Sequence, residues 1–204
     1  MKKSFFYNCL LLTVLLTSCT STKIVSSWRQ SNKHIHINEL NKVLVIALIE
    51  NETNRYKAEH QIVKYLDGKG FVSHEYLDDK FNRKNETEVM DKIREDGFDG
   101  VVLMRLIDVD KERIYIPNET NYYPADFQNF GGYYKVHQYR YQTSGYYLTT
   151  KTYILETIVF SLKDNKIIWS GITETFEPEG IKKMTSEISK VIYKRMVEEK
   201  FIRK

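Results

Sequence analysis

Cysteine, proline and glycine are scarce in this 204-residue chain, which has two, three and nine of them. Both cysteines lie among the first 19 residues, so the rest of the chain has no disulfide and no cysteine-based metal site. No segment repeats, and none is a linker rich in proline, glycine or serine. The chain is therefore not a disulfide scaffold or a repeat protein, and its length suits one globular domain.

An excess of charge of one sign is also lacking. The chain has 31 Lys and Arg residues, which become 29 if Lys2 and Lys3 leave with a signal peptide, against 27 Asp and Glu. Such a balance gives no electrostatic reason to expect nucleic acid as a partner. Residues 67–70 (DGKG) lack the pattern of a phosphate-binding loop, and no G-x-S-x-G elbow occurs. We expect no cofactor, and the motifs assign no catalytic residue.

The apolar run FFYNCLLLTVLL, at residues 5–16, is too short to cross a bilayer as a helix. It follows a basic start, as in secretory signals, and leads into Leu16-Thr17-Ser18-Cys19. These four residues resemble the lipobox of bacterial lipoproteins. The resemblance implies that residues 1–18 are a signal peptide, cleaved between Ser18 and Cys19, and that Cys19 is acylated. An ordinary secretory signal with a chance cysteine is the alternative.

Acylation of Cys19 would make membrane lipid the first partner of the protein. Each buried methylene contributes about 0.8 kcal/mol, so several acyl chains form a permanent anchor. Thr20 follows the cysteine, where an aspartate would signal inner-membrane retention, and no acidic run resembles a surface-export tag. We therefore expect the protein at the outer membrane, facing the periplasm.

Hydrophobic periodicity predicts the rest of the fold. Residues 19–41 are expected to be a lipidated tether, within which residues 23–28 form a short edge strand. Further strands are expected at 42–50, 71–77, 99–109, 147–162 and 166–176, and helices at 51–68, 85–97 and 181–200. Residues 42–204 would then be one α/β domain with a mixed sheet of five or six strands, a βαβαβ core, a C-terminal β-hairpin and three helices.

Two local signals refine this scheme. The tripeptide NET begins at Asn51, Asn85 and Asn118, and the first two asparagines precede helices, where Asn caps free amides. The turn KDNK, at residues 163–166, predicts a hairpin whose paired residue numbers sum to about 329. That register would place Glu156 near Thr173 and also within reach of Arg105.

The order of these segments resembles that of a family of small bacterial envelope lipoproteins of unknown function. The resemblance rests on KVLVIALIE, GFVSHEYL and DGFDGVVLMRL, and above all on the hairpin YILETIVFSLKDNKIIWSGITETF. More distantly, the arrangement is similar to the N-terminal domain of the TolB translocation protein and to the periplasmic domain of the curli secretion-channel lipoprotein. These similarities imply a non-catalytic envelope module. The long alternating segments that form the curli channel's barrel are missing, which argues against a pore.

Several polar residues are weighed as candidates for chemistry. They are His34 with His36, Glu59 with His60, His74 with Glu75, Asp78 with Asp79, and Asp108 with Asp110. The H-x-H pair lacks a nearby third ligand, so we expect no metal site. Glu59 and His60 are expected on a solvated helix face. The aspartates follow strands, where ligands bind in α/β sheets, and a catalytic or divalent-cation site there is the alternative to a polar loop.

The Tyr-rich insertion at residues 117–145 is the main candidate binding surface. Its aromatic strip, continued into the next strand, comprises Tyr133, Tyr134, Tyr139, Arg140, Tyr141, Tyr146 and Tyr147. Tyrosine combines apolar area with a polar tip, which suits the binding of a glycan or of an extended peptide. We expect a projecting arm whose tyrosines face solvent or a partner. The alternative is a loop that folds back and buries its rings.

Together these patterns predict a membrane-anchored envelope lipoprotein that acts as a binding or scaffold module for an envelope protein or a glycan. Two alternatives stay open. One is an envelope hydrolase that uses Asp and Glu residues at strand ends, and the other is an oligomeric subunit of a secretion apparatus.

Overall fold

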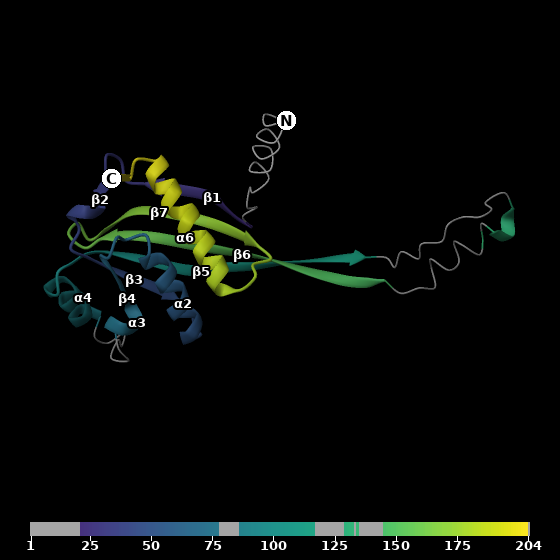
Figure 1. Cartoon of the computed structure of the whole chain (residues 1–204), viewed down its shortest axis with the longest axis horizontal. Coiled ribbons are helices and arrows are strands. Elements are labelled where there is room, and N and C mark those ends of the chain that lie inside the picture. Colours follow the sequence, from purple (N-terminus) through teal and green to yellow (C-terminus); the bar gives the residue numbers. More distant parts are fainter. Residues whose placement is uncertain (1–20, 78–85, 117–128, 133, 135–144, 204) are drawn as a thin grey trace, which may run out of the picture.

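The structure, a computed structural model, describes residues 21–77, 86–116, 129–132, 134 and 145–203. Helices cover the two faces of a six-stranded sheet, and two of its strands extend far beyond the other four (Figure 1). The strands are β1 (Thr22–Arg29), β2 (Ile35–His36), β3 (Lys42–Leu48), β4 (Gly70–Val72), β5 (Phe98–Ile116), β6 (Tyr146–Ser161), β7 (Lys166–Phe176) and β8 (Ile202–Arg203). The helices are η1 (Ile37–Glu39), α2 (Glu52–Val63), α3 (Ser73–Tyr76), α4 (Glu86–Glu95) and α6 (Ile181–Glu198).

The sheet has the order β1-β7-β6-β5-β3-β4. β3 pairs with β4 and β5 in parallel, as the predicted βαβαβ core requires, whereas β5, β6, β7 and β1 pair antiparallel. The mixed sheet, the C-terminal hairpin and three helices longer than two turns confirm the predicted fold class. β1 occupies an edge, so the segment predicted as a tether contributes a strand to the sheet.

Apolar side chains fill the space on both faces of the sheet. On one face α2 and α6 cover the larger core, in which Trp169 and Ile188 are fully buried. On the other face α4 packs Ile93 against Leu44 and Val101. The alternation along β6 produces this division, because residues 155, 157 and 159 are buried beneath the first pair of helices while the residues between them are half-buried.

The segment at residues 71–77 was predicted to be a strand, which is correct for residues 71 and 72 and wrong from Ser73 onward. β4 ends at Val72, and the chain then turns into the short helix α3. Tyr76 in α3 donates a hydrogen bond to Asp96 at 2.5 Å, and this contact joins α3 to the end of α4. Hydrogen bonds from Lys92 and from Tyr76 keep the pKa of Asp96 below its usual value.

The hairpin register differs from the prediction by one residue. Leu155 lies opposite Thr173, and Glu156 lies opposite Ile172 rather than Thr173. The reason is an irregularity between Val159 and Phe160, which shifts the pairing near the turn. Glu156 makes an ion pair with Arg105 on β5 at 2.6 Å, as the sequence suggested.

The end of α6 is fixed to the sheet by one carboxylate. Glu199 accepts hydrogen bonds from Ser27 at 2.5 Å, from Trp169 Nε1 at 2.8 Å and from Arg195 at 2.8 Å. Burial alone raises the pKa of Glu199, but these donors and the charge of Arg195 outweigh it, so the pKa lies below its usual value. In the described part of the chain, no helix has both the length and the apolar character needed to cross a membrane.

Candidate functional site

β5 and β6 form a two-stranded ribbon that projects from the body of the domain (Figure 1). The sheet partner β3 pairs with β5 only as far as Arg105, and β7 pairs with β6 only as far as Thr152. Beyond those points β5 and β6 continue to pair from Lys111 and Lys151 out to Ile116 and Tyr146. We call residues 111–116 and 146–151 the ribbon. Among the described residues, neither outer edge of the ribbon has a neighbouring strand.

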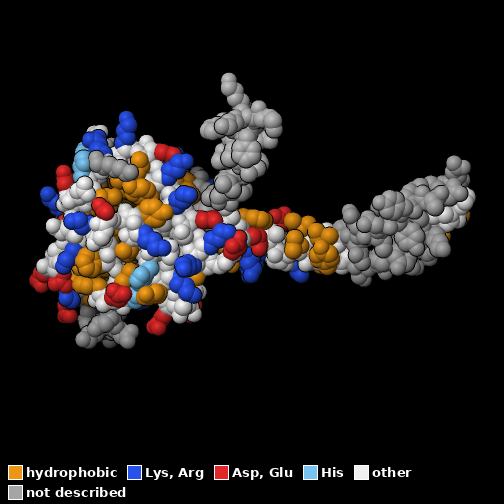
Figure 2. Space-filling view, in the orientation of Figure 1, with side chains coloured by type: hydrophobic (Ala, Val, Ile, Leu, Met, Phe, Trp, Pro, Cys, Tyr) orange, Lys and Arg blue, Asp and Glu red, His pale blue; other side chains and the backbone are white. Residues whose placement is uncertain are grey.

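Side-chain chemistry changes along this projection. Near the body, β5 carries Asp108 and Asp110, followed by Lys111, Glu112 and Arg113. Farther out lies a group of exposed apolar side chains that we call the distal apolar band: Ile114, Tyr115, Tyr146, Tyr147 and Leu148, each between 42% and 62% exposed. Figure 2 shows the charged side chains near the body and the hydrophobic ones beyond them. The ribbon therefore holds apolar surface away from the core.

Contacts within the ribbon fix two of these rings. Tyr115 and Tyr147 lie opposite each other with centroids 5.2 Å apart, and the Arg113 guanidinium lies 5.3 Å from the Tyr147 ring. The Tyr115 hydroxyl accepts a hydrogen bond from the Gly145 amide at 3.0 Å. These contacts place aromatic faces in a defined arrangement, as a binding surface requires.

The predicted tyrosine surface is described only in part. Tyr146 and Tyr147 belong to the distal apolar band, and Tyr134 is exposed, with its ring stacked on that of Phe130 at 5.7 Å. Tyr133, Tyr139, Arg140 and Tyr141 lie outside the described residues, as do Ser18, Cys19, Asn85 and Asn118. Sequence reasoning missed Ile114, Tyr115 and Leu148, because it ended the strand that contains the first two at Val109.

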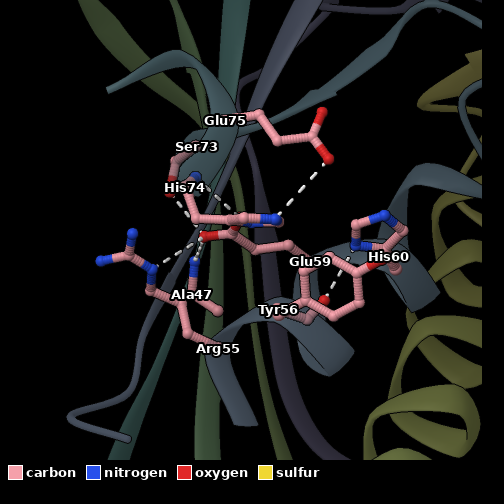
Figure 3. Close-up of polar contacts among 8 residues, drawn as sticks. All are labelled: Ala47, Arg55, Tyr56, Glu59, His60, Ser73, His74 and Glu75. Carbon is pink, nitrogen blue, oxygen red and sulfur yellow. Dashed lines mark hydrogen bonds and ion pairs between the residues drawn. The ribbon is translucent and has the colours of Figure 1, made fainter. Parts of the chain in front are cut away.

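A second polar centre lies inside the body, around Glu59 of α2 (Figure 3). Glu59 was expected on a solvated helix face, and this is wrong, since its side chain is completely buried. Its Oε1 accepts hydrogen bonds from the Ala47 amide at 3.1 Å and from the Ser73 hydroxyl at 2.5 Å. Its Oε2 accepts from the His74 amide at 3.2 Å and from His74 Nδ1 at 2.8 Å. One carboxylate thus satisfies donors at the end of β3 and the start of α3.

The surroundings of Glu59 are aromatic and basic. The rings of Tyr56 and His74 lie 4.7 Å apart, and those of Tyr56 and His60 4.1 Å apart. Ser73 donates to Glu59 and not to a histidine, so the carboxylate–histidine pair is not joined to a nucleophile. The contacts of Glu59 join β3, α2 and α3. The sequence did hold a signal for the burial of Glu59. Glu59 lies three residues before Ile62 and four before Val63, so it shares the helix face of these two apolar residues.

The remaining candidates do not converge. His34 and His36 make an edge-to-face ring contact at 5.8 Å, and the described residues contain no group of three or more His, Cys, Asp or Glu side chains suited to a metal. Asp108 and Asp110 lie where the projection begins, opposite Ile154 and Thr152. Asp78 and Asp79 lie outside the described residues. The Asn51 side chain caps α2 as predicted, accepting from the Asn54 amide at 3.0 Å.

Comparisons with known proteins find likeness in structure only. No protein-family model matches the chain, and no curated protein gives a significant match. Similar solved structures include the PelC dodecamer from Paraburkholderia phytofirmans (TM-score 0.43, 8% identity, 82% of this chain and 95% of that one). They also include lipoprotein GNA1162 from Neisseria meningitidis (TM-score 0.38, 8% identity, 77% and 98%) and a PDZ domain protein from Parabacteroides distasonis (TM-score 0.35, 12% identity, 92% and 39%). Likeness at this level does not assign a function.

Proposed function

We propose that the protein is a membrane-anchored envelope lipoprotein that acts by binding, as a scaffold module, and that the ribbon is its binding arm. The observation that carries this proposal is the distal apolar band, which the two strands hold away from the body (Figure 2). Isolated two-stranded ribbons are marginally stable in water, and contiguous exposed apolar surface is typical of interaction sites. A partner that covers the band would both stabilise the ribbon and remove its apolar surface from water.

The kind of partner follows from the surface. Tyrosine rings beside Arg113 suit stacking against a glycan or an extended peptide. The free strand edges favour the peptide, because an added strand pairs with unpaired amides and carbonyls at such an edge. We therefore favour an envelope protein that contributes an extended segment. The alternative, an oligomeric subunit, has support in the same edges, since a second copy of the chain could cover them.

The proposed location rests on the N-terminal residues. Acylation at Cys19 would tether the domain to a membrane through a short segment, because β1 begins at Thr22. The absence of an aspartate after Cys19 supports the outer membrane, and the absence of an acidic run supports the periplasmic face. Protease treatment of intact cells tests this placement. Cleavage as efficient as that of a surface protein would overturn it.

Photo-crosslinking in living cells tests the binding arm. A photoactivatable amino acid replaces Ile114, which is 42% exposed on the ribbon, or Ile167, which is 41% exposed on the body. The two positions match in residue type, strand context and exposure. We expect a crosslinked product from the Ile114 position that mass spectrometry resolves into a second envelope protein. Equal labelling from both positions would remove the case for the ribbon, and crosslinks between two copies would favour the oligomeric alternative.

A further inference from the structure

A cavity of about 780 Å³ runs along the sheet from the carboxyl end of β3, at Leu48, to the turn between β6 and β7, at Asn165. The chain leaves β3 through α2 on one face, whereas α4, which leads into β5, lies on the other face. Such divergence opens a crevice at the carboxyl ends of neighbouring strands, where α/β proteins bind ligands. The volume falls in the range of small-molecule sites, about 300 to 1,000 Å³.

The lining of the cavity is mainly apolar. Leu48 at the end of β3 and Leu103 in β5 form its floor, and Leu77 and Met90 line it from the helical side. Leu48 is 55% exposed, and the other three side chains are half-buried. This surface would accept an alkyl chain, because each buried methylene removes apolar area from water.

One cation, Arg55 of α2, lines the same cavity. Its Nε is buried and makes no hydrogen bond within the described part of the chain. Arg55 Nε makes a long ion pair with Glu59, whose Oε1 lies 3.9 Å away and already accepts hydrogen bonds from Ala47 and Ser73. Figure 3 shows the Arg55 guanidinium turned away from His74 and His60. The Arg55 guanidinium thus has a carboxylate nearby but no hydrogen bond within the described residues, and its unsatisfied donors favour a further anionic group.

We propose that this cavity binds an amphiphile whose single anionic head pairs with Arg55 and whose alkyl chain lies on Leu48 and Leu103. The guanidinium fork matches the oxygens of a carboxylate and those of a phosphate. Glu52, at the first turn of α2, also lines the cavity and opposes an anion, but its side chain is exposed to solvent, which screens its charge. The site is separate from the ribbon, so this inference does not rest on the proposed function.

Photo-labelling of the full chain in nanodiscs of phosphatidylcholine tests the site. The probe is dodecanoate with a diazirine near the chain end, and peptide mapping reports where it reacts. We expect labelling in the segments that line the cavity, residues 42–57, 73–77, 89–105 or 160–165, with competition by dodecanoate or dodecyl phosphate showing which head is preferred. Inorganic phosphate should not compete. The same alkyl chain on an amine head should label these peptides at least about tenfold less, because Arg55 would repel it.

Three variants assign the head-group contact. Arg55→Met should reduce labelling at least about tenfold, since a charge-assisted hydrogen bond is lost. Lys57→Met removes an exposed cation from the same helix outside the cavity and should change labelling by less than about twofold. Glu52→Gln should increase labelling about twofold, because it removes the opposing charge.

Thermal melts accompany each variant. If Arg55→Met does not fold, Glu52→Gln decides the matter, and labelling that fails to increase would overturn the proposal. Labelling of other peptides, equal labelling of a folded Arg55→Met, or equal labelling by the amine probe would also overturn it.

Discussion

His74 Nδ1 donates a hydrogen bond to Glu59 Oε2 at 2.8 Å, across 15 residues of sequence and from one helix to another. The pair fixes α3 against α2, and Glu59 also holds the Ala47 amide at the end of β3. Replacing Glu59 with alanine would leave several buried donors unsatisfied. We expect Glu59→Ala to lower the free energy of unfolding by about 3 kcal/mol, measured by urea denaturation.

The adjacent acid provides a control for that experiment. Glu75 lies 3.7 Å from His74 Nε2, but its side chain is 66% exposed. Glu75→Ala should therefore change stability by less than about 0.5 kcal/mol. Equal losses for Glu59→Ala and Glu75→Ala would mean that Glu59 is not the carboxylate that organises this region.

Acid should weaken the junction between α6 and β1 through Glu199. The donors around Glu199 hold its pKa below its usual value, whereas the unfolded chain restores a pKa of about 4.3. A lowered folded pKa contributes stability that is complete above the unfolded pKa and is lost as the pH falls through the folded pKa. The difference in stability between wild type and Glu199→Gln should thus be constant above about pH 5.5 and shrink below it.

Chemical denaturation at a series of pH values measures this difference. Glu198→Gln is the matched control, because Glu198 is 51% exposed and faces Lys194 at 3.6 Å. Its difference from wild type should stay near zero throughout. A Glu199→Gln difference that does not change between pH 6 and pH 3 would contradict the role given to Glu199.

Lipid attachment is predicted from Leu16-Thr17-Ser18-Cys19 alone. Cys19→Ala should leave an uncleaved precursor that takes up no radiolabelled palmitate in growing cells, because the thiol that accepts diacylglycerol is absent. Cys9→Ala is the control and should leave processing and labelling unchanged. Palmitate uptake by Cys19→Ala would show that the lipobox interpretation is wrong.

Hydrophobic periodicity predicted most helices and strands of the domain body, because a buried face imposes a regular spacing of apolar residues. Residues 166–176 form β7 as expected, and the apolar spacing from Ile181 produces α6. The same method failed after Val72, where the chain turns into α3 beside the buried carboxylate of Glu59, which accepts hydrogen bonds from the Ser73 hydroxyl and the His74 amide. The pattern of residues 71–77 cannot reveal this contact, because Glu59 lies in another helix. It also ended β5 too early, because residues 110–115 are exposed on both faces and lack the pattern that burial produces.

The distal apolar band should be dispensable for folding. Ile114, Tyr147 and Leu148 are at least 42% exposed, and exposed substitutions usually change stability by less than about 0.5 kcal/mol each. Serine at all three positions should therefore leave the melting temperature of the body nearly unchanged. A buried aromatic truncated in this way would cost about 3–5 kcal/mol, so a collapsed melt would assign these side chains to the core.

The most direct test of the binding arm compares folding and contact in the same cells. The triple serine variant at Ile114, Tyr147 and Leu148 carries a photoactivatable residue at Tyr146, and Ile167→Ser with the same residue serves as the control. We predict that the triple variant melts like wild type but loses the crosslinked envelope partner, while the control keeps it. A triple variant that melts normally and keeps its crosslink would contradict the claim that the ribbon binds through its distal apolar band.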